Sequence, residues 1–183
     1  MENYEKETIA AIATALSDSG IGIVRISGEN AIYIVDSIFR SASGKKILTK
    51  VQSHMIHYGY IVDKDENIID EVMTSVMKAP KSYTMEDTVE INCHGGVLVM
   101  QKVLETVLQA GARLAEPGEF TKRSFLNGRI DLSRAEAVID VIHSQNEYAL
   151  SSSVSQLKGR LSDKIRSLRE AVSYTHLRAH ETK

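Results

Sequence analysis

Two charged side chains interrupt apolar, strand-like segments and are the first candidates for chemistry. Arg25 lies inside the run Ile21–Ile26, and Glu90 lies between Val89 and Ile91. Alternate side chains of a strand point to opposite faces, so each charge occupies the face opposite the main apolar positions. One interpretation is a solvated sheet face with a cross-strand ion pair. The other is a pocket in which the carboxylate accepts two N–H donors from a flat heterocycle, while the guanidinium holds an anionic group.

Arg129, in the segment NGRID, is a third candidate for such a pocket. Three other features are better explained by structure. Gly95-Gly96 precedes a predicted helix and favours a tight turn over an anion site. His94 has no Cys or carboxylate partner at metal-ligand spacing, and Cys93 ends an apolar strand as a small buried hydrophobe. We therefore predict no metal site and no catalytic residue in this chain.

A nucleotide-binding P-loop is missing from the sequence. The nearest similarity to G-x-x-x-x-G-K-[ST] is Gly44-Lys45-Lys46, but position 39 is Phe and Lys46 replaces the required Ser or Thr. We expect no binding of GTP or ATP at a P-loop by this chain alone.

Composition narrows the class of protein. The 183 residues carry 22 Lys plus Arg against 24 Asp plus Glu, a net charge of −2, and are 43% hydrophobic. These values are typical of a soluble globular protein and exclude collagen-like or wholly disordered chains. No apolar run approaches the roughly 18 residues of a membrane span, so we expect no membrane association. A single cysteine excludes an internal disulfide and, with no visible signal peptide, predicts a cytoplasmic protein.

The elements that must position these residues alternate between strands and single helices. Apolar periodicity predicts strands over residues 8–14, 22–27, 55–62, 68–77, 88–93 and 112–115. It predicts helices after Asn30, with a face that includes Phe39, and over residues 97–110. Several strands are joined by short turns, which indicates an α+β fold with helices packed on a mainly antiparallel sheet.

After Gly118 the pattern becomes helical. A short helix is expected over residues 119–126, and Ser133 with Glu136 predicts a capping box for a helix that ends at Ser144. Apolar residues then recur with an 11-residue period, which predicts one long helix from Leu150 to Val172. Its apolar seam has too few predicted partners here, so part of the helical layer is expected to be missing or supplied by another chain.

We therefore predict three segments. Residues 1–118 form an α+β domain, residues 119–172 begin a helical domain that is cut short, and residues 173–183 are a non-native tail. The tail breaks the apolar period and resembles a translated sequencing-adaptor sequence.

Four stretches resemble the MnmE (TrmE) family of tRNA modification GTPases. They are TIAAIAT (8–14), GIVRISG (22–28), CHGG (93–96) and, above all, AEPGEFTKRSFLNGRIDLSRAEA (115–137). The last stretch is long and unusual, and the resemblance runs from about Thr8 to Val172. It implies a folate-binding domain like that of aminomethyltransferases, followed by the first helices of a helical domain. The inserted GTPase domain, with its GTP, Mg²⁺ and K⁺ sites, is then absent from this chain.

The resemblance also implies function and partners. Members form homodimers through this domain and bind 5-formyltetrahydrofolate or a related one-carbon folate. With the flavoprotein MnmG they hydrolyse GTP and modify C5 of the wobble uridine in certain tRNAs. Arg25, Glu90 and Arg129 fall on the family's folate-contacting positions. Our hypothesis is that Glu90 pairs with the amino-imino edge of the pterin, and that the arginines hold carboxylate or formyl oxygens.

Two alternatives stay open. One is a folate-dependent aminomethyltransferase, which shares the ancestry of this domain. The other is a purely structural dimer module, which would bind no folate. The basic stretch around Arg123 and Arg129 fits tRNA phosphates, the glutamate tail of a folate, or a solvated helix face equally well.

Overall fold

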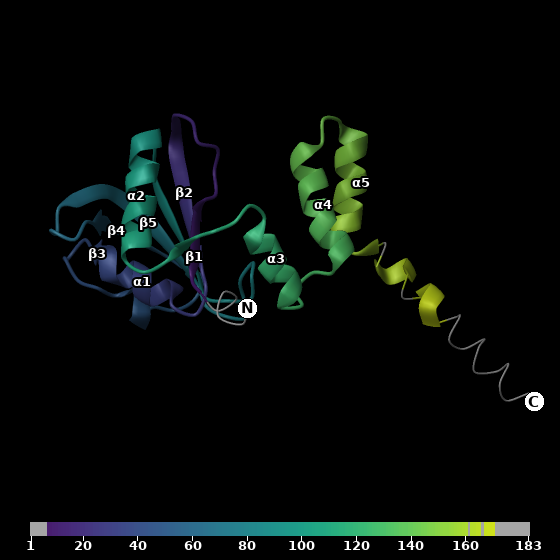
Figure 1. Ribbon diagram of the computed structural model, residues 1–183, viewed down its shortest axis with the longest axis horizontal. Coiled ribbons are helices and arrows are strands. Elements are labelled where there is room, and N and C mark those ends of the chain that lie inside the picture. The colour runs from purple at the N-terminus through teal and green to yellow at the C-terminus, as the bar shows by residue number, and fades with distance from the viewer. Residues whose placement is uncertain (1–6, 161, 166, 171–183) are drawn as a thin grey trace, which may run out of the picture. The chain divides into compact units, whose positions relative to one another are not determined.

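Seven strands form one sheet in the first of two compact units of the chain (Figure 1). The computed structural model describes residues 7–160, 162–165 and 167–170, and the units span residues 1–127 and 128–183. The division falls after Asn127, so the helix that follows Gly118 belongs with the sheet. The predicted tail, 173–183, and Val172 lie outside the described residues.

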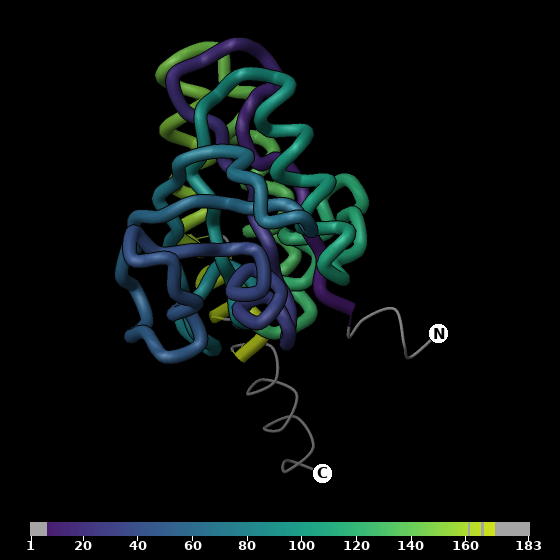
Figure 2. The backbone as a smooth tube through the Cα atoms, turned by 90° about the vertical axis from the view of Figure 1, so that its left-hand side faces the viewer, coloured from purple at the N-terminus to yellow at the C-terminus, as the bar shows by residue number. Residues whose placement is uncertain are grey.

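The sheet is antiparallel except at one edge. Its strands are β1 (Ile9–Ile12), β2 (Ser19–Ser27), β3 (Phe39–Ser41), β4 (Met55–Val62), β5 (Ile68–Met77), β6 (Thr88–Gly95) and β7 (Arg113–Leu114). Their order is β3-β4-β5-β6-β2-β1-β7, with only the short β1–β7 pair parallel. The path of the chain through this sheet can be followed by colour in Figure 2. The predicted α+β fold with a mainly antiparallel sheet is confirmed.

Two helices cover one face of this sheet. They are α1 (Ala31–Ile38) and α2 (Val97–Gln109), and a short 3-10 turn (Leu48–Lys50) packs against α1. Beneath them lie fully buried strand residues such as Val24, Val76 and Ile91. Burying each such side chain contributes about 1.5–3 kcal/mol, so this core fixes which strand residues face the opposite side.

The opposite face of the central strands carries the predicted chemistry. Arg25 of β2 lies directly across from Glu90 of β6, which in turn lies across from Ser75 of β5. Since side chains alternate along each strand, all three leave the core face. The open face then becomes apolar, since Ile56 of β4, which lies across from Ser75, is 64% exposed and Met73 of β5 is 47% exposed.

One residue predicted to be helical is instead part of a strand. Phe39 was expected on the apolar face of the first helix, but α1 ends at Ile38 and Phe39 has extended backbone, with φ −92° and ψ 139°. It pairs with Ile61 of β4 and is fully buried. Burial was therefore correctly expected, while the periodicity did not show that the chain changes direction at this residue.

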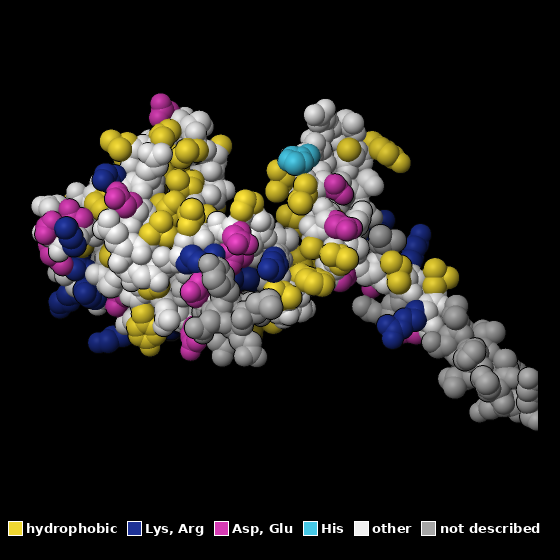
Figure 3. All heavy atoms as spheres, viewed as in Figure 1, with side chains coloured by type: hydrophobic (Ala, Val, Ile, Leu, Met, Phe, Trp, Pro, Cys, Tyr) yellow, Lys and Arg dark blue, Asp and Glu magenta, His cyan; other side chains and the backbone are white. Residues whose placement is uncertain are grey.

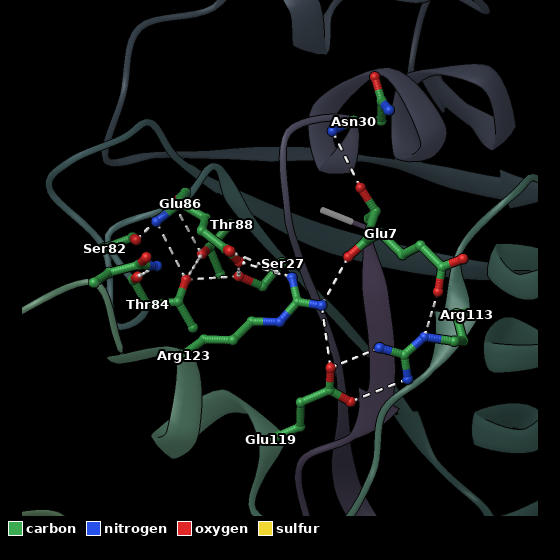
Figure 4. A network of polar contacts seen from close by, with 12 residues as sticks. Glu7, Ser27, Asn30, Ser82, Thr84, Glu86, Thr88, Arg113, Glu119 and Arg123 are labelled. Atoms are coloured by element: carbon green, nitrogen blue, oxygen red, sulfur yellow. Dashed lines mark hydrogen bonds and ion pairs between the residues drawn. The ribbon is translucent and has the colours of Figure 1, made fainter. Parts of the chain in front are cut away.

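Helix α3 (Glu119–Leu126) is held to the sheet unit by buried charges (Figure 4). Arg123 donates from Nη2 to the Glu7 carbonyl at 2.8 Å and to Glu119 Oε1 at 3.1 Å, and from Nη1 to Glu86 Oε2 at 3.2 Å. Arg113 donates to the same Glu119 carboxylate at 2.6 and 3.1 Å. A buried charge is tolerated only when paired in this way, so the network fixes where the first turn of α3 lies.

The second unit is a hairpin of two helices, α4 (Leu132–His143) and α5 (Glu147–Leu157). The predicted capping box is wrong. Asp131 is the N-cap of α4, because its carboxylate accepts the N–H of Arg134 at 3.0 Å. Ser133 donates its hydroxyl to the same carboxylate at 2.8 Å. A carboxylate two residues earlier therefore takes the capping role predicted for the serine.

The single long helix predicted from Leu150 is also wrong. Helix α5 ends at Leu157, and Gly159 adopts the left-handed conformation with φ +88°. Its N–H bonds the carbonyl of Gln156 at 2.8 Å, which closes the helix end. Glycine stops helices in this way because it has no Cβ to clash. Helical backbone resumes at Arg160 in the described residues.

Much of the apolar surface in the second unit is uncovered, as the yellow side chains over α4 and α5 show in Figure 3. Ile139 is 57% exposed, Ile142 72% and Leu168 67%. The expectation that part of the helical layer is missing or supplied by another chain stays a prediction. In the part of the chain that the structure describes, the helices are all too short or too polar to cross a membrane.

Candidate functional site

An ion pair on the open face of the sheet is the centre of the candidate site. Arg25 Nε donates to Glu90 Oε1 at 2.7 Å, and the two side chains are 30% and 23% exposed. The pairing follows from register, since the two residues are directly opposite in the antiparallel β2–β6 ladder. The sequence placed both charges on one face, and the structure brings them into contact.

The ion pair leaves several of its atoms available. Among residues 7–160, 162–165 and 167–170, the hydrogen bond engages only Nε of Arg25 and Oε1 of Glu90. Glu90 Oε2 can still accept N–H donors, and the two terminal nitrogens of Arg25 can still donate to an anion. A partly exposed carboxylate next to a guanidinium fork suits a planar ligand that has both N–H donors and acidic oxygens.

Two aromatic rings lie close to the guanidinium of Arg25. Its Cζ lies 5.6 Å from the ring centroid of Tyr83 and 5.6 Å from that of Phe120. Both distances lie within the roughly 6 Å range of a cation–π interaction. Tyr83 belongs to the loop between β5 and β6, and Phe120 to the first turn of α3. Sequence reasoning missed both rings, because no local pattern relates them to Arg25.

The loop that carries Tyr83 is fixed by polar contacts. The Ser27 hydroxyl bonds the Thr84 hydroxyl at 2.6 Å and donates to Glu86 Oε2 at 2.8 Å (Figure 4). Ser27 and Thr84 are fully buried. The Tyr83 hydroxyl also bonds Thr121 Oγ1 of α3 at 3.0 Å. The loop and α3 are therefore held to the sheet and to each other close to Arg25.

A hollow lies on the same face beyond the ion pair. It is lined by side chains that include Ile21, Tyr58, Met73 and Asn92. Asn92 is two residues from Glu90 on the same face of β6, a separation of about 7 Å along a strand. The open face therefore offers a mainly apolar surface next to the charged pair.

Arg129 lies in the second unit and is exposed. Its membership of a site with Arg25 and Glu90 stays a prediction.

The three residue groups that the sequence assigned to structure can now be assessed. A Cβ on Gly95 would lie 2.4 Å from the Ser19 carbonyl oxygen, so glycine permits close strand packing there. Cys93 is buried, and burial raises the pKa of its thiol to about 11. The structural interpretation of Cys93 is confirmed, while Gly95 ends β6 and is needed for close packing against Ser19 rather than for a tight turn.

His94, in contrast, is exposed and has a carboxylate partner that the sequence did not reveal. Its Nδ1 lies 2.7 Å from Asp70 Oδ1, and its backbone N–H donates to Asp70 Oδ2 at 2.8 Å. The hydrogen bond to Asp70 raises the pKa of the imidazole above its usual value. In the described residues, no three His, Cys, Asp or Glu side chains cluster as metal ligands.

Comparison with known proteins gives the same family for a family model and for individual relatives. A family model described as GTP-binding protein TrmE N-terminus matches residues 8–129. The chain is 63% identical over 166 residues to a protein of Lachnoclostridium phytofermentans named tRNA modification GTPase MnmE. Proteins of the same name from Geobacillus kaustophilus and Bacillus subtilis are 56% identical over 172 residues and 52% identical over 170.

These alignments cover 91%, 93% and 92% of this chain but only 36%, 37% and 37% of the three relatives, respectively. The chain thus spans little more than a third of the length of the proteins it matches.

Proposed function

Because this chain belongs to the TrmE N-terminus family, we propose that it is the N-terminal part of a GTP-hydrolysing tRNA modification enzyme. The supporting observation is the match over residues 8–129, together with relatives that are all named tRNA modification GTPase MnmE. GTP hydrolysis, with its Mg²⁺ and K⁺, belongs to the remaining two thirds of such a protein. The same names favour this function over the aminomethyltransferase alternative.

The role of the described domain is to bind a one-carbon folate on the open face of the sheet. The residues fit such a ligand, since Glu90 Oε2 is available for the amino-imino edge of a pterin. The terminal nitrogens of Arg25 are available for carboxylate or formyl oxygens. Arg129 is the third proposed contact. A bound folate would supply the one-carbon unit, while this chain binds and orients it.

The same proposal includes three partners, namely a second copy of this chain, the flavoprotein MnmG and tRNA. The domain forms a homodimer, and the whole protein acts with the flavoprotein MnmG on C5 of the wobble uridine of certain tRNAs in the cytoplasm. The uncovered apolar residues of α4 and α5, such as Ile142, are consistent with a helical layer completed by further chain. The domain organisation we propose is therefore a folate-type α+β domain followed by the start of a helical domain.

A thermal-shift experiment with 5-formyltetrahydrofolate tests the binding role. At about 100 times its dissociation constant, a ligand that binds only the folded chain stabilises it by about 2.7 kcal/mol. We expect a rise in unfolding temperature that depends on ligand concentration. No shift at any concentration would favour the purely structural dimer module and contradict the proposal.

A further inference from the structure

We propose that Tyr83 and Phe120 form an aromatic clamp that positions Arg25 for ligand binding. This inference rests on the proposed folate site and adds two residues to it. The clamp is defined by the two rings, each 5.6 Å from the Arg25 guanidinium.

Without the two rings, the guanidinium of Arg25 would be less restricted. The Arg25 side chain starts from the face of the sheet opposite α1 and α2, and is 30% exposed. A long arginine side chain loses about 2 kcal/mol of rotamer freedom when it is fixed. One hydrogen bond to Glu90 holds Nε alone. The rings restrict the rest of the guanidinium, so its free nitrogens have one direction before a ligand arrives.

The rings themselves are held in place by the contacts of neighbouring residues. Phe120 follows Glu119, whose carboxylate accepts from both Arg113 and Arg123. Tyr83 precedes Thr84, which is buried against Ser27, and its hydroxyl bonds Thr121 of α3. The two rings therefore come from segments that are anchored to the sheet and to each other, which is an arrangement that pre-organises a binding group.

Glu90 is also affected by the aromatic clamp. Its Oε1 is held by Arg25, so the orientation of Oε2 depends on where the guanidinium sits. A clamp that fixes Arg25 therefore fixes the carboxylate as well. Tyr83 and Phe120 act through Arg25 as positioning residues, and flat, anion-bearing heterocycles are the ligands that benefit.

The test compares aromatic with aliphatic replacements by calorimetry with 5-formyltetrahydrofolate. Tyr83→Leu and Phe120→Leu remove a ring, while Tyr83→Phe and Phe120→Tyr keep it. A cation–π interaction of about 0.5–2 kcal/mol corresponds to an affinity about 2- to 30-fold weaker for each leucine variant. Phe120→Tyr should bind about as well as the unchanged chain, and Tyr83→Phe, which also removes the hydroxyl bond to Thr121, should lose less affinity than Tyr83→Leu. Tyr33→Leu, on α1 and 67% exposed, is the matched control.

The outcomes separate the two proposals. If the unchanged chain binds no folate, the proposed function fails and the clamp fails with it. If it binds, but the leucine variants bind equally well, the clamp alone is wrong. The clamp is also wrong if the ring-retaining variants lose as much affinity as the leucine variants. Thermal unfolding without ligand verifies that each variant folds, and the two rings give two independent trials.

Discussion

Arg25 and Glu90 face each other at directly paired positions of β2 and β6, joined from Nε to Oε1 at 2.7 Å. The sequence left two separate interpretations of these charges, a cross-strand ion pair and a ligand pocket, and the contact is compatible with both. It is a cross-strand ion pair, and it also presents an unused carboxylate oxygen and two guanidinium nitrogens on an open face. Because both side chains are partly exposed, the pair itself adds only about 0–1 kcal/mol to stability. Its proposed value lies in binding.

Acid should loosen helix α3 through Glu119. Burial alone would raise the pKa of Glu119, but hydrogen bonds from Arg113, the Glu116 N–H and Arg123 outweigh it and lower the pKa to about 2. The unfolded-state value is near 4.5, so this stabilisation is present above pH 4.5 and is lost as the pH falls toward 2. We expect a loss of roughly 3 kcal/mol over that range.

Unfolding by urea at a series of pH values measures this loss. Glu119→Gln should be less stable than the unchanged chain at pH 7 and should show a shallower dependence between pH 4.5 and 2. Glu105→Gln, on the exposed surface of α2, is the control and should keep the original dependence. An unchanged slope in Glu119→Gln would show that this carboxylate does not anchor α3.

Two separate alanine substitutions, at Asp131 and at Ser133, test which residue is the N-cap of α4. Asp131→Ala removes the carboxylate that accepts the Arg134 N–H and should cost about 0.5–2 kcal/mol. Ser133→Ala removes only a hydroxyl that donates to that carboxylate and should cost less. Chemical unfolding of both variants ranks them. A larger loss for Ser133→Ala would restore the capping box predicted from sequence.

The end of α5 depends on glycine at position 159. A Cβ there would meet a left-handed backbone, φ +88°, and would lie 1.9 Å from Nη2 of Arg134. Gly128 has a similar φ of +78° but nothing within 4 Å of its added Cβ. Both alanine variants should lose about 1–2 kcal/mol from the backbone, and Gly159→Ala should lose more.

Comparison of the two melting curves tests this ranking, and Arg134→Ala combined with Gly159→Ala should recover part of the difference. Equal losses in the two glycine variants would mean that Arg134 moves aside without cost.

The strands and helices of the first unit were largely predictable from sequence. The ranges expected for β4 and β5, residues 55–62 and 68–77, match the structure, because clear turn residues separate two alternating apolar runs. The shared face of Arg25 and Glu90 was predictable for the same reason. Their direct contact was one of two interpretations and could not be chosen from sequence, since register depends on the whole sheet rather than on either strand.

The features that escaped prediction arise from tertiary contacts or from single residues. Tyr83 and Phe120 reach Arg25 from a loop and a helix that are distant in sequence. Gly159 lies off the apolar seam, so the 11-residue period continues through it although its backbone conformation ends the helix. Asp131 is the N-cap of α4 because its carboxylate accepts the N–H of Arg134. The Ser133–Glu136 pattern had instead predicted Ser133 as the N-cap.

The most direct test of folate binding is calorimetry of 5-formyltetrahydrofolate with Glu90→Lys, against Glu105→Lys as a control on the helix-covered side of the sheet. The proposal predicts that Glu90→Lys loses measurable binding, because a cation replaces the acceptor of the pterin N–H donors and repels Arg25. Glu105→Lys should bind like the unchanged chain. Unaltered affinity in a folded Glu90→Lys variant would contradict the account.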